Sequence, residues 1–284
     1  MGVKETGKSV ILTTESGASA EIKLFGATVT SWKQGGKERL FVSSKSAMDS
    51  SKPIRGGIPV VFPIFGPAQS SYPPAYASLP QHGFARTLDW TLEKTVMDRS
   101  EGVSVRFACP TPPNFAPPFK LAYVVTLSKH QLSTDLHITN TSDSEDFIFQ
   151  ALLHSYLAVP DIRKISIKGL DAGITYTDKT QNMKEVKWDG GELKISAETD
   201  RVYKKVPSQH LELDDGEGSS LKIRFKGFED AVTWNPSEGG NNMADMEQDG
   251  YKRFVCVEPG YVSEFKTLKP GEEFLGQQIL TAEE

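Results

Sequence analysis

The sequence predicts an all-β protein, a large antiparallel β-sandwich, from three observations. Short β-rich or alternating runs recur along the whole 284-residue chain, and turn residues separate them. No segment carries a long apolar stripe of helical period, and strands do not alternate with helices as in a parallel sheet. We expect one domain over residues 1–284, because no repeat, low-complexity tract or charged linker divides the chain.

Each expected strand is a run in which apolar or β-branched residues alternate with polar ones. In chain order these runs cover residues 9–14, 20–26, 28–33, 88–94, 103–108, 121–128, 132–139, 165–170, 221–225, 231–235, 262–268 and 272–280. Two further runs, residues 147–159 and 253–260, are apolar on both faces, which predicts strands in a sheet that is covered on both sides. Pro259-Gly260 should end the second of them.

Two long loops stand out by their proline content, residues 66–80 and residues 110–118. Proline lacks the donor that a sheet ladder needs, so neither segment can be an interior strand. Loops of this length in a compact domain are often functional. Because two arginine-bearing motifs flank the first loop, we expect it to form one lip of a ligand cleft.

The charge balance excludes some classes of partner. The chain has 32 basic and 37 acidic residues and a net charge of -5, which argues against binding to nucleic acid or to an anionic membrane. No apolar run reaches the ~18 residues that a membrane span requires, and the first residues lack a secretory signal. An anionic ligand would therefore need a local cluster of arginines.

Cysteine content indicates a reducing compartment. The two cysteines, Cys109 and Cys256, cannot form a disulfide framework, and neither lies in a C-x-x-C pattern. We therefore expect a cytoplasmic protein. Separately, we expect a monomer. The opening MGVKET also matches a loose myristoylation pattern, and the sequence leaves that modification open.

One polar ring stands in the first of the two apolar runs. The two-residue period of a strand puts His154 on the same face as Ile148 and Leu152. A buried imidazole needs a polar partner. Gln150 or Tyr156 could supply it, as in a purely structural histidine, or a residue from a distant segment could supply it, as in an acid/base site.

The second apolar run offers that distant partner. Glu258 shares a strand face with Phe254 and Cys256, and a carboxylate flanked by Val257 and Pro259 costs free energy to bury unless it is paired or functional. His154 and Glu258 are therefore candidates for a catalytic acid and base.

Among the other histidines only His82 competes for a chemical role. His130 lies in an expected turn and His137 in a strand with polar neighbours, so we expect both to be exposed, and His210 lies in a polar stretch. None of the five histidines shows metal-ligand spacing, and no phosphate-binding glycine loop occurs, so neither a metal centre nor a nucleotide cofactor is indicated.

Two arginine motifs are candidates for anion binding. RGG, residues 55–57, places Arg55 beside two glycines that would let the backbone approach a ligand. QHGFAR, residues 81–86, concentrates Gln81, His82 and Arg86. A guanidinium offers forked donors that suit phosphate or carboxylate oxygens, although Arg55 could equally be a surface residue beside a turn.

Two potential nucleophiles are set aside. Ser155 follows His154 directly, and adjacent strand residues face opposite sides of a sheet, so their side chains cannot meet. Cys256 has no cationic neighbour along the strand that would lower the pKa of its thiol, so it is read as a small apolar filler.

Six ordered motifs together resemble one enzyme family. They are RGGIPVVFPIFG (55–66), LPQHGFAR (79–86), QALLHSYL (150–157), ETDRVY (198–203), DAVTWNP (230–236) and VCVEPGYV (255–262). They look like those of the aldose 1-epimerase, or galactose mutarotase, family, in the branch that acts on glucose 6-phosphate, over about residues 8–280. The resemblance implies a large β-sandwich (a galactose mutarotase-like supersandwich) that is open along one concave face for a sugar.

The resemblance also implies roles for individual residues. It assigns the general acid to His154 and the general base to Glu258. Arg55 and Arg86 correspond to phosphate-binding arginines. Sugar contacts are implied for Gln81, His82 and Asp200. The sequence departs from the family pattern at Ser237, where an aromatic residue is common, and at Pro259, where a small one is usual, which puts the local cleft wall in doubt.

The implied reaction is exchange of the α and β anomers of a hexose 6-phosphate, with no cofactor. A base removes the C1 hydroxyl proton while an acid protonates the ring oxygen, and the opened ring recloses after rotation about C1–C2. Three alternatives stay open: an epimerase for unphosphorylated hexoses, a non-catalytic sugar-binding sandwich with Trp188 and Trp234 as platforms, and a glycosidase using Asp200 and Glu258.

Overall fold

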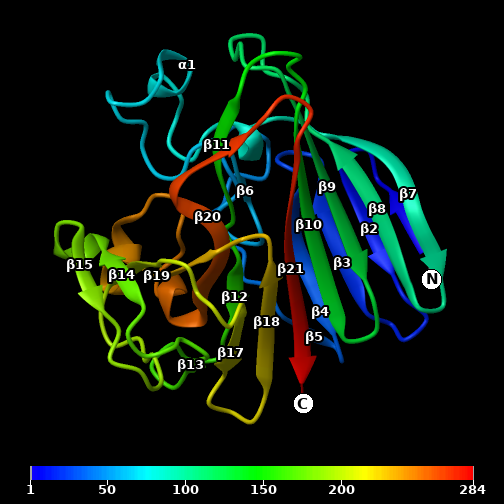
Figure 1. Cartoon of the computed structure of the whole chain (residues 1–284). Helices are drawn as coiled ribbons and strands as arrows, with labels where there is room; N and C mark the ends of the chain where they lie inside the picture. Colours follow the sequence, from blue (N-terminus) through cyan, green and yellow to red (C-terminus); the bar gives the residue numbers. More distant parts are fainter. Residues whose placement is uncertain (1, 284) are drawn as a thin grey trace.

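Antiparallel sheets make up almost all of the fold in this computed structural model, which describes residues 2–283 (Figure 1). The five-stranded sheet has the order β1-β2-β3-β4-β5. Its strands are β1 Gly2–Glu5, β2 Ser9–Thr13, β3 Ser19–Lys23, β4 Thr28–Gln34 and β5 Lys37–Glu38.

The second sheet has eight strands in the order β13-β17-β18-β21-β10-β9-β8-β7. Its strands are β7 Thr91–Arg99, β8 Gly102–Ala108, β9 Phe119–Leu127, β10 Gln131–Asn140, β13 Ser166–Lys168, β17 His210–Asp214, β18 Ser220–Lys226 and β21 Glu273–Glu283. Along β10 every second residue is buried, as the predicted alternation requires.

The third sheet has the order β15-β14-β16-β19-β20-β11-β6, and β12 also pairs with β20. Its strands are β6 Val60–Val61, β11 Phe147–Leu153, β12 Tyr156–Ala158, β14 Thr175–Asp178, β15 Lys184–Lys187, β16 Thr199–Tyr203, β19 Asp230–Asn235 and β20 Phe254–Leu268.

Helical elements are short. They are α1 Pro74–Ala77 and the 3-10 turns η1 Ala85–Thr87, η2 Lys179–Gln181, η3 Ser237–Asn242 and η4 Gly250–Arg253. Within residues 2–283, no helix has the length and apolar character to cross a membrane. The predicted all-β class is therefore confirmed, including the absence of a long helical stripe within the described chain.

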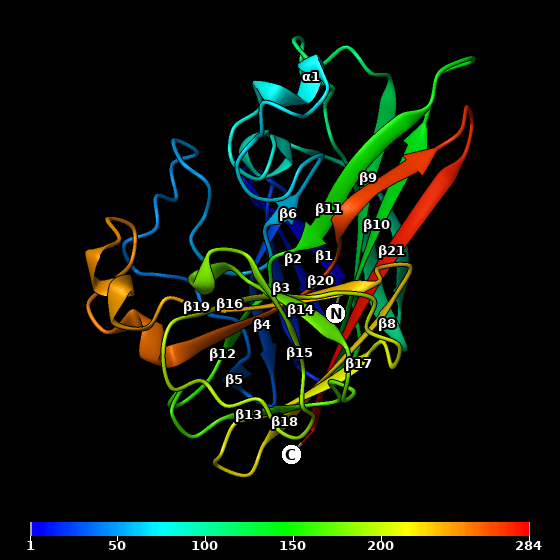
Figure 2. The same cartoon turned by 60° about the vertical axis from the view of Figure 1, so that its left-hand side comes forward.

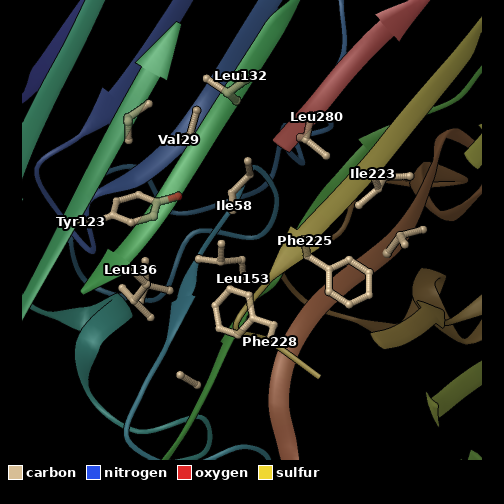
Figure 3. Packing of buried hydrophobic residues seen from close by; sticks show 14 of the residues in the cluster. Val29, Ile58, Tyr123, Leu132, Leu136, Leu153, Ile223, Phe225, Phe228 and Leu280 are labelled. Carbon is tan, nitrogen blue, oxygen red and sulfur yellow. The ribbon is translucent and has the colours of Figure 1, made fainter. Parts of the chain in front are cut away.

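The sheets enclose one main apolar core. Side chains from β4, β10, β11 and β18 point into the same interior, as Val29, Leu132, Leu153 and Ile223 show in Figure 3. Burial of apolar surface of this kind stabilises a fold by roughly 25 cal/mol per Å². The three sheets therefore stabilise one another through a shared core, which holds the third sheet in a fixed position.

One strand boundary was predicted wrongly. Strand β20 does not end at Pro259-Gly260 but runs on to Leu268. Val257 donates its N–H to Ser155 O, on the side of β20 that faces β12 and β11. The backbone nitrogen of Pro259, two residues further along the strand, faces the same side. On that side β12 gives way to β11 as the partner of β20, so the missing N–H interrupts no regular ladder.

The loop predictions are confirmed in part. Residues 110–118 contain no strand, and residues 66–80 contain only α1, which stands above β6 and β11 in Figure 2. Within residues 66–80, Tyr72 and Tyr76 pack against Phe265, so the middle of this loop does not form the lip of the cavity described below. Only its flanking residues reach that cavity.

The glycines of the RGG motif serve a different purpose from the predicted one. A Cβ atom on Gly56 would lie 2.3 Å from Phe41 O, and one on Gly57 would lie 2.2 Å from Val29 O. Both residues also have positive φ angles, 129° and 67°. These glycines therefore let the chain pass close to neighbouring backbone, and it is their packing rather than a ligand that requires them.

Gly57→Ala should lower the free energy of unfolding by ~3 kcal/mol or more, because backbone strain and overlap with Val29 O add together. Gly17→Ala is the matched control, since Gly17 has a φ of 83° but nothing within 4 Å of the added Cβ atom, and it should cost about 1 kcal/mol. Urea unfolding monitored by circular dichroism measures both losses. Equal losses would contradict the close-approach explanation.

Candidate active site

The third sheet gathers the candidate residues on one face. Asp200 of β16 lies opposite Trp234 of β19, and Trp234 lies opposite Cys256 of β20. Val232 lies opposite Glu258 two positions further along. Because side chains alternate across a strand, these residues share one face, while residues between them, such as Val257, face the main core.

A cavity of about 250 Å³ opens on that face. Its lining includes six of the seven predicted site residues. The lining residues are Arg55, Phe65, Gln81, His82, His154, Lys179, Asp200, Val232, Trp234, Met243 and Glu258. The six predicted residues, all but Arg86, thus border a single hollow, although they come from five separate segments of the chain.

His154 and Glu258 meet at the floor of this cavity. His154 Nδ1 lies 3.3 Å from Glu258 Oε1, and Glu258 is only 1% exposed. His154 directly follows β11, and its backbone N–H donates to Pro59 O. Among residues 2–283, neither His154 Nδ1 nor the two carboxyl oxygens of Glu258 have a hydrogen-bond partner of good geometry. The contact between them is therefore the main polar interaction of both groups.

The surroundings push the pKa values of these two groups apart. Burial, and then Asp200, raise the pKa of Glu258 well above its ordinary value, and Lys179 opposes this. Burial, and then His82, Arg86 and Arg55, lower the pKa of His154 well below its ordinary value. In the ligand-free pocket a proton shared by the pair is thus favoured on Glu258.

The neighbours proposed for His154 behave differently from one another. Gln150 does not contact it, because its amide accepts from Phe65 N and donates to Val262 O. The alternative in which Gln150 satisfies the His154 ring is therefore wrong, because backbone groups of other segments already engage its amide. Tyr156 does contact His154, but by stacking, with ring centroids 4.7 Å apart and planes 10° from parallel.

Arg55 is held in the cavity wall by two partners. Its Nε donates to Asp245 Oδ2 at 3.1 Å, and its Nη1 donates to Tyr156 Oη at 3.1 Å. Burial disfavours its charge, but Tyr156 and Asp245 outweigh this and raise the pKa of Arg55 above its ordinary value. The guanidinium is therefore a fixed cation connected to His154 through the Tyr156 ring.

Arg86 lies behind the lining rather than in it. Its Nη2 donates to Gln81 O at 2.8 Å, which ties the side chain to the exposed lining residue Gln81. Its Nε is buried and has no hydrogen-bond partner in the described chain. Burial lowers the pKa of Arg86 to about 10, so at neutral pH it remains a cation.

His82 is a neutral member of the site. Its backbone has a positive φ of 66°, and its Nδ1 accepts a hydrogen bond from Gly66 N at 3.2 Å. Burial, and then Arg86, Lys179 and Arg55, lower its pKa to about 3. Because Nδ1 is an acceptor, the ring proton belongs on Nε2, which makes His82 a hydrogen-bond donor.

Asp200 does not act alone at its end of the cavity. Lys179 Nζ lies 2.8 Å from Asp200 Oδ2 and also lies over the Phe65 ring, 5.0 Å from its centroid. Burial raises the pKa of Asp200, and Lys179 opposes this. The pair therefore offers both an acceptor and a donor to a ligand.

Three possible metal ligands meet beside the cavity. His154, Cys256 and Glu258 form the one group within residues 2–283 whose ligand atoms all lie within 4.8 Å of one another. Burial and then Glu258 raise the pKa of Cys256 well above its ordinary value, so its free thiol is protonated at neutral pH. The thiol packs with Phe254 and Tyr156, as an apolar filler should.

Several other residues considered in the sequence lie outside the cavity lining. Ser155 points away from His154 and donates to Gln278 Oε1. His130 is exposed, as expected, but the prediction of an exposed His137 was wrong, because β10 lies within a sheet and leaves this side chain half-buried. His210 on β17 is half-buried as well. Trp188 packs against Tyr176 and Tyr203 instead of lining the cavity.

Sequence reasoning missed Lys179, Asp245 and Met243. All three lie outside the six motifs, in or next to short turns between strands, where no periodic pattern marks a residue. Lys179 follows Asp178, which caps η2 by accepting from Thr180 N, and this turn signal could have marked the segment. The side-chain pairing with Asp200 could not be read from sequence.

A larger hollow of about 480 Å³ lies elsewhere, between the first sheet and the loop that contains Met48. Its lining includes Lys8, Lys23, Asp49 and Asp89 but no histidine or glutamate. The smaller cavity is therefore the better candidate, because an acid and a base converge there.

His82→Gln should remove a pH dependence of folding. A histidine whose pKa falls from about 6.5 in the unfolded chain to about 3 in the folded one stabilises the fold above pH 6.5, and this contribution is lost as the pH falls toward 3. Between pH 7 and pH 5 the loss from this group is ~2 kcal/mol. Urea unfolding at both pH values should show a smaller change for the variant, and equal changes would contradict the prediction.

The chain matches proteins of known sequence over nearly its whole length. The family model described as "Aldose 1-epimerase" matches residues 8–281. A protein of Escherichia coli K12 named "Putative glucose-6-phosphate 1-epimerase" is 35% identical, with 93% of this chain and 87% of that protein covered. One of the same name from Cenchrus ciliaris is 32% identical, with 97% and 84% covered.

Solved structures agree with this match. The crystal structure of a "putative mutarotase" from Salmonella typhimurium superimposes with a TM-score of 0.85 at 27% identity, covering 99% of this chain and 92% of that one. A galactose 1-epimerase from Lactobacillus acidophilus, 15% identical, has a TM-score of 0.73 over 100% of this chain and 97% of its own, which shows a shared fold. The chain therefore belongs to the aldose 1-epimerase family.

Proposed function

We propose that the protein interconverts the α and β anomers of a hexose 6-phosphate, with glucose 6-phosphate as the first candidate. The observation that carries the proposal is the His154–Glu258 contact of 3.3 Å, at the floor of a cavity that Arg55 also lines. The names of the two relatives above, 32% and 35% identical, support a phosphorylated glucose as substrate.

In the proposed reaction Glu258 and His154 act as base and acid. The Glu258 carboxylate accepts the proton of the C1 hydroxyl while His154 donates a proton to the ring oxygen, and the C1–O5 bond breaks to give the open-chain aldehyde. Rotation about C1–C2 and the reverse proton transfers close the other anomer. After the ring has closed again, Glu258 is once more a carboxylate and His154 once more carries its proton, so the cycle needs no further proton.

The rest of the cavity orients the sugar phosphate. Arg55, fixed by Asp245 and Tyr156, lines the cavity and supplies donors suited to phosphate oxygens, and Arg86 adds a second positive charge from behind the lining. His82, Gln81 and the Lys179–Asp200 pair offer polar contacts to hydroxyl groups. Binding energy from the phosphate then holds C1 at the acid/base pair.

We further infer that the working unit is a cytoplasmic monomer built as one domain. Both cysteines are free thiols, which supports a reducing compartment. The cavity lining draws on residues from Arg55 to Glu258, which supports a single domain.

His154→Asn and Glu258→Gln should each lower enzyme-driven exchange of glucose 6-phosphate anomers by ~10² to 10⁴-fold, because each removes a proton-transfer group. Magnetisation-transfer NMR measures the exchange, and calorimetry should show that the sugar phosphate still binds. The controls are His137→Asn on β10 and Glu264→Gln, an exposed residue of the same strand as Glu258. Full activity in either active-site variant would remove that residue from its role.

Arg55→Met and Arg86→Met should each lower kcat/KM for glucose 6-phosphate by roughly 10 to 10²-fold, because each loses a positive charge that attracts the phosphate. Turnover of glucose itself should not fall. Arg224→Met, at an exposed position of β18, is the control. If turnover of both sugars falls alike, the arginines merely brace the cavity and the enzyme acts on unphosphorylated hexoses.

A further inference from the structure

The proton distribution of the ligand-free site is the reverse of the one that the proposed reaction needs. An imidazolium acid and a carboxylate base are required, but the buried surroundings favour neutral His154 and protonated Glu258. Both distributions carry the same single proton and the same net charge. Moving the proton across the 3.3 Å contact is therefore sufficient to convert one into the other.

Cations gather on the His154 side of the pair. Tyr156 stacks on the imidazole and accepts a hydrogen bond from Arg55, so the guanidinium is connected to the ring through one side chain. The His82 ring lies edge-on to His154, with centroids 5.9 Å apart, and Arg86 contributes a second guanidinium. Burial is the first cause that opposes an imidazolium, and because His82 is neutral, the two arginines are the charges that add to it.

The Glu258 side has the opposite character. Asp200 is its anionic neighbour and opposes a second negative charge, and Lys179 neutralises Asp200 only in part. The Cys256 thiol, whose high pKa keeps it neutral, adds no charge. Nothing on this side is expected to change when a phosphate binds beside the arginines.

We propose that the phosphate of the bound sugar decides which member of the pair holds the shared proton. Without an anion beside Arg55 and Arg86 the proton stays on Glu258. A phosphate dianion offsets the two positive charges, after which the O–H bond at Glu258 Oε1 breaks, a bond between that proton and His154 Nδ1 forms, and the electron pair remains on the carboxylate. No proton is exchanged with solvent.

This inference rests on the proposed function and extends it to specificity. A sugar without phosphate would fill the cavity but leave the pair in the resting distribution. Discrimination against glucose should then lie in kcat as well as in KM, because the acid and base are prepared only when the phosphate is present.

The test is the protonation state of His154 in the full chain labelled with ¹⁵N-histidine, read by long-range ¹H–¹⁵N NMR at pH 7. His154→Asn assigns the signals. The ligands are 1,5-anhydroglucitol 6-phosphate, which lacks the anomeric hydroxyl and cannot react, and 1,5-anhydroglucitol. We expect unequal ring-nitrogen shifts, typical of neutral imidazole, in the free protein and with the unphosphorylated ligand, and nearly equal shifts, typical of imidazolium, with the phosphorylated one.

A ligand-free variant provides an independent readout. Arg55→Met combined with Arg86→Met removes the two charges that the phosphate would offset, so the imidazolium fraction of His154 at pH 7 should be higher than in the free wild-type protein. Arg224→Met, on another sheet, should leave that fraction unchanged. An imidazolium in the free wild-type protein, a neutral His154 in the saturated phosphate complex, or an unchanged imidazolium fraction in the double variant would overturn the inference.

Failure of this inference and failure of the proposed function give different results. If the enzyme exchanges glucose 6-phosphate anomers while His154 stays neutral in the phosphate complex, only the proton relocation is wrong. If the wild-type protein does not accelerate that exchange, the proposed function itself is wrong.

Discussion

The contact between His154 and Glu258 is expensive to bury, and the site is organised around it. A carboxyl group that is 1% exposed loses nearly all of its hydration, and neither of its oxygens receives a good hydrogen bond from residues 2–283. Such a group can stay in place only if it is neutral or faces a group with which it shares a proton. The imidazole, 3.3 Å away, is that group.

The sheet architecture makes this burial stable. One face of β19 and β20 packs into the main core through residues such as Val255 and Val257, while the other face carries Val232, Trp234 and Glu258. Because the core face fixes the strands, the acid and base cannot move apart without disrupting apolar packing. The stability of the sandwich and the precision of the site thus have a common origin in strand alternation.

The charged groups are distributed unevenly around the cavity. Arg55 and Arg86 affect His154, whereas Asp200 and Lys179 affect Glu258. A site with this division responds to an anion at one end by changing the proton affinity of the group nearest to it. In the proposed function, phosphate recognition and acid/base chemistry would therefore be linked by electrostatics, in addition to the orientation that a bound phosphate would provide.

The sequence by itself determined the all-β class, most of the strands and the residues His154 and Glu258, because alternation and the cost of an isolated buried polar group are local properties of the chain. It could not determine the continuation of β20 past Pro259, since the tolerance of that proline depends on which strand lies beside it. Nor could it show that Tyr156 joins Arg55 to His154, or that Lys179 pairs with Asp200. Those contacts join segments far apart in the chain, so only the packing of the sheets decides them.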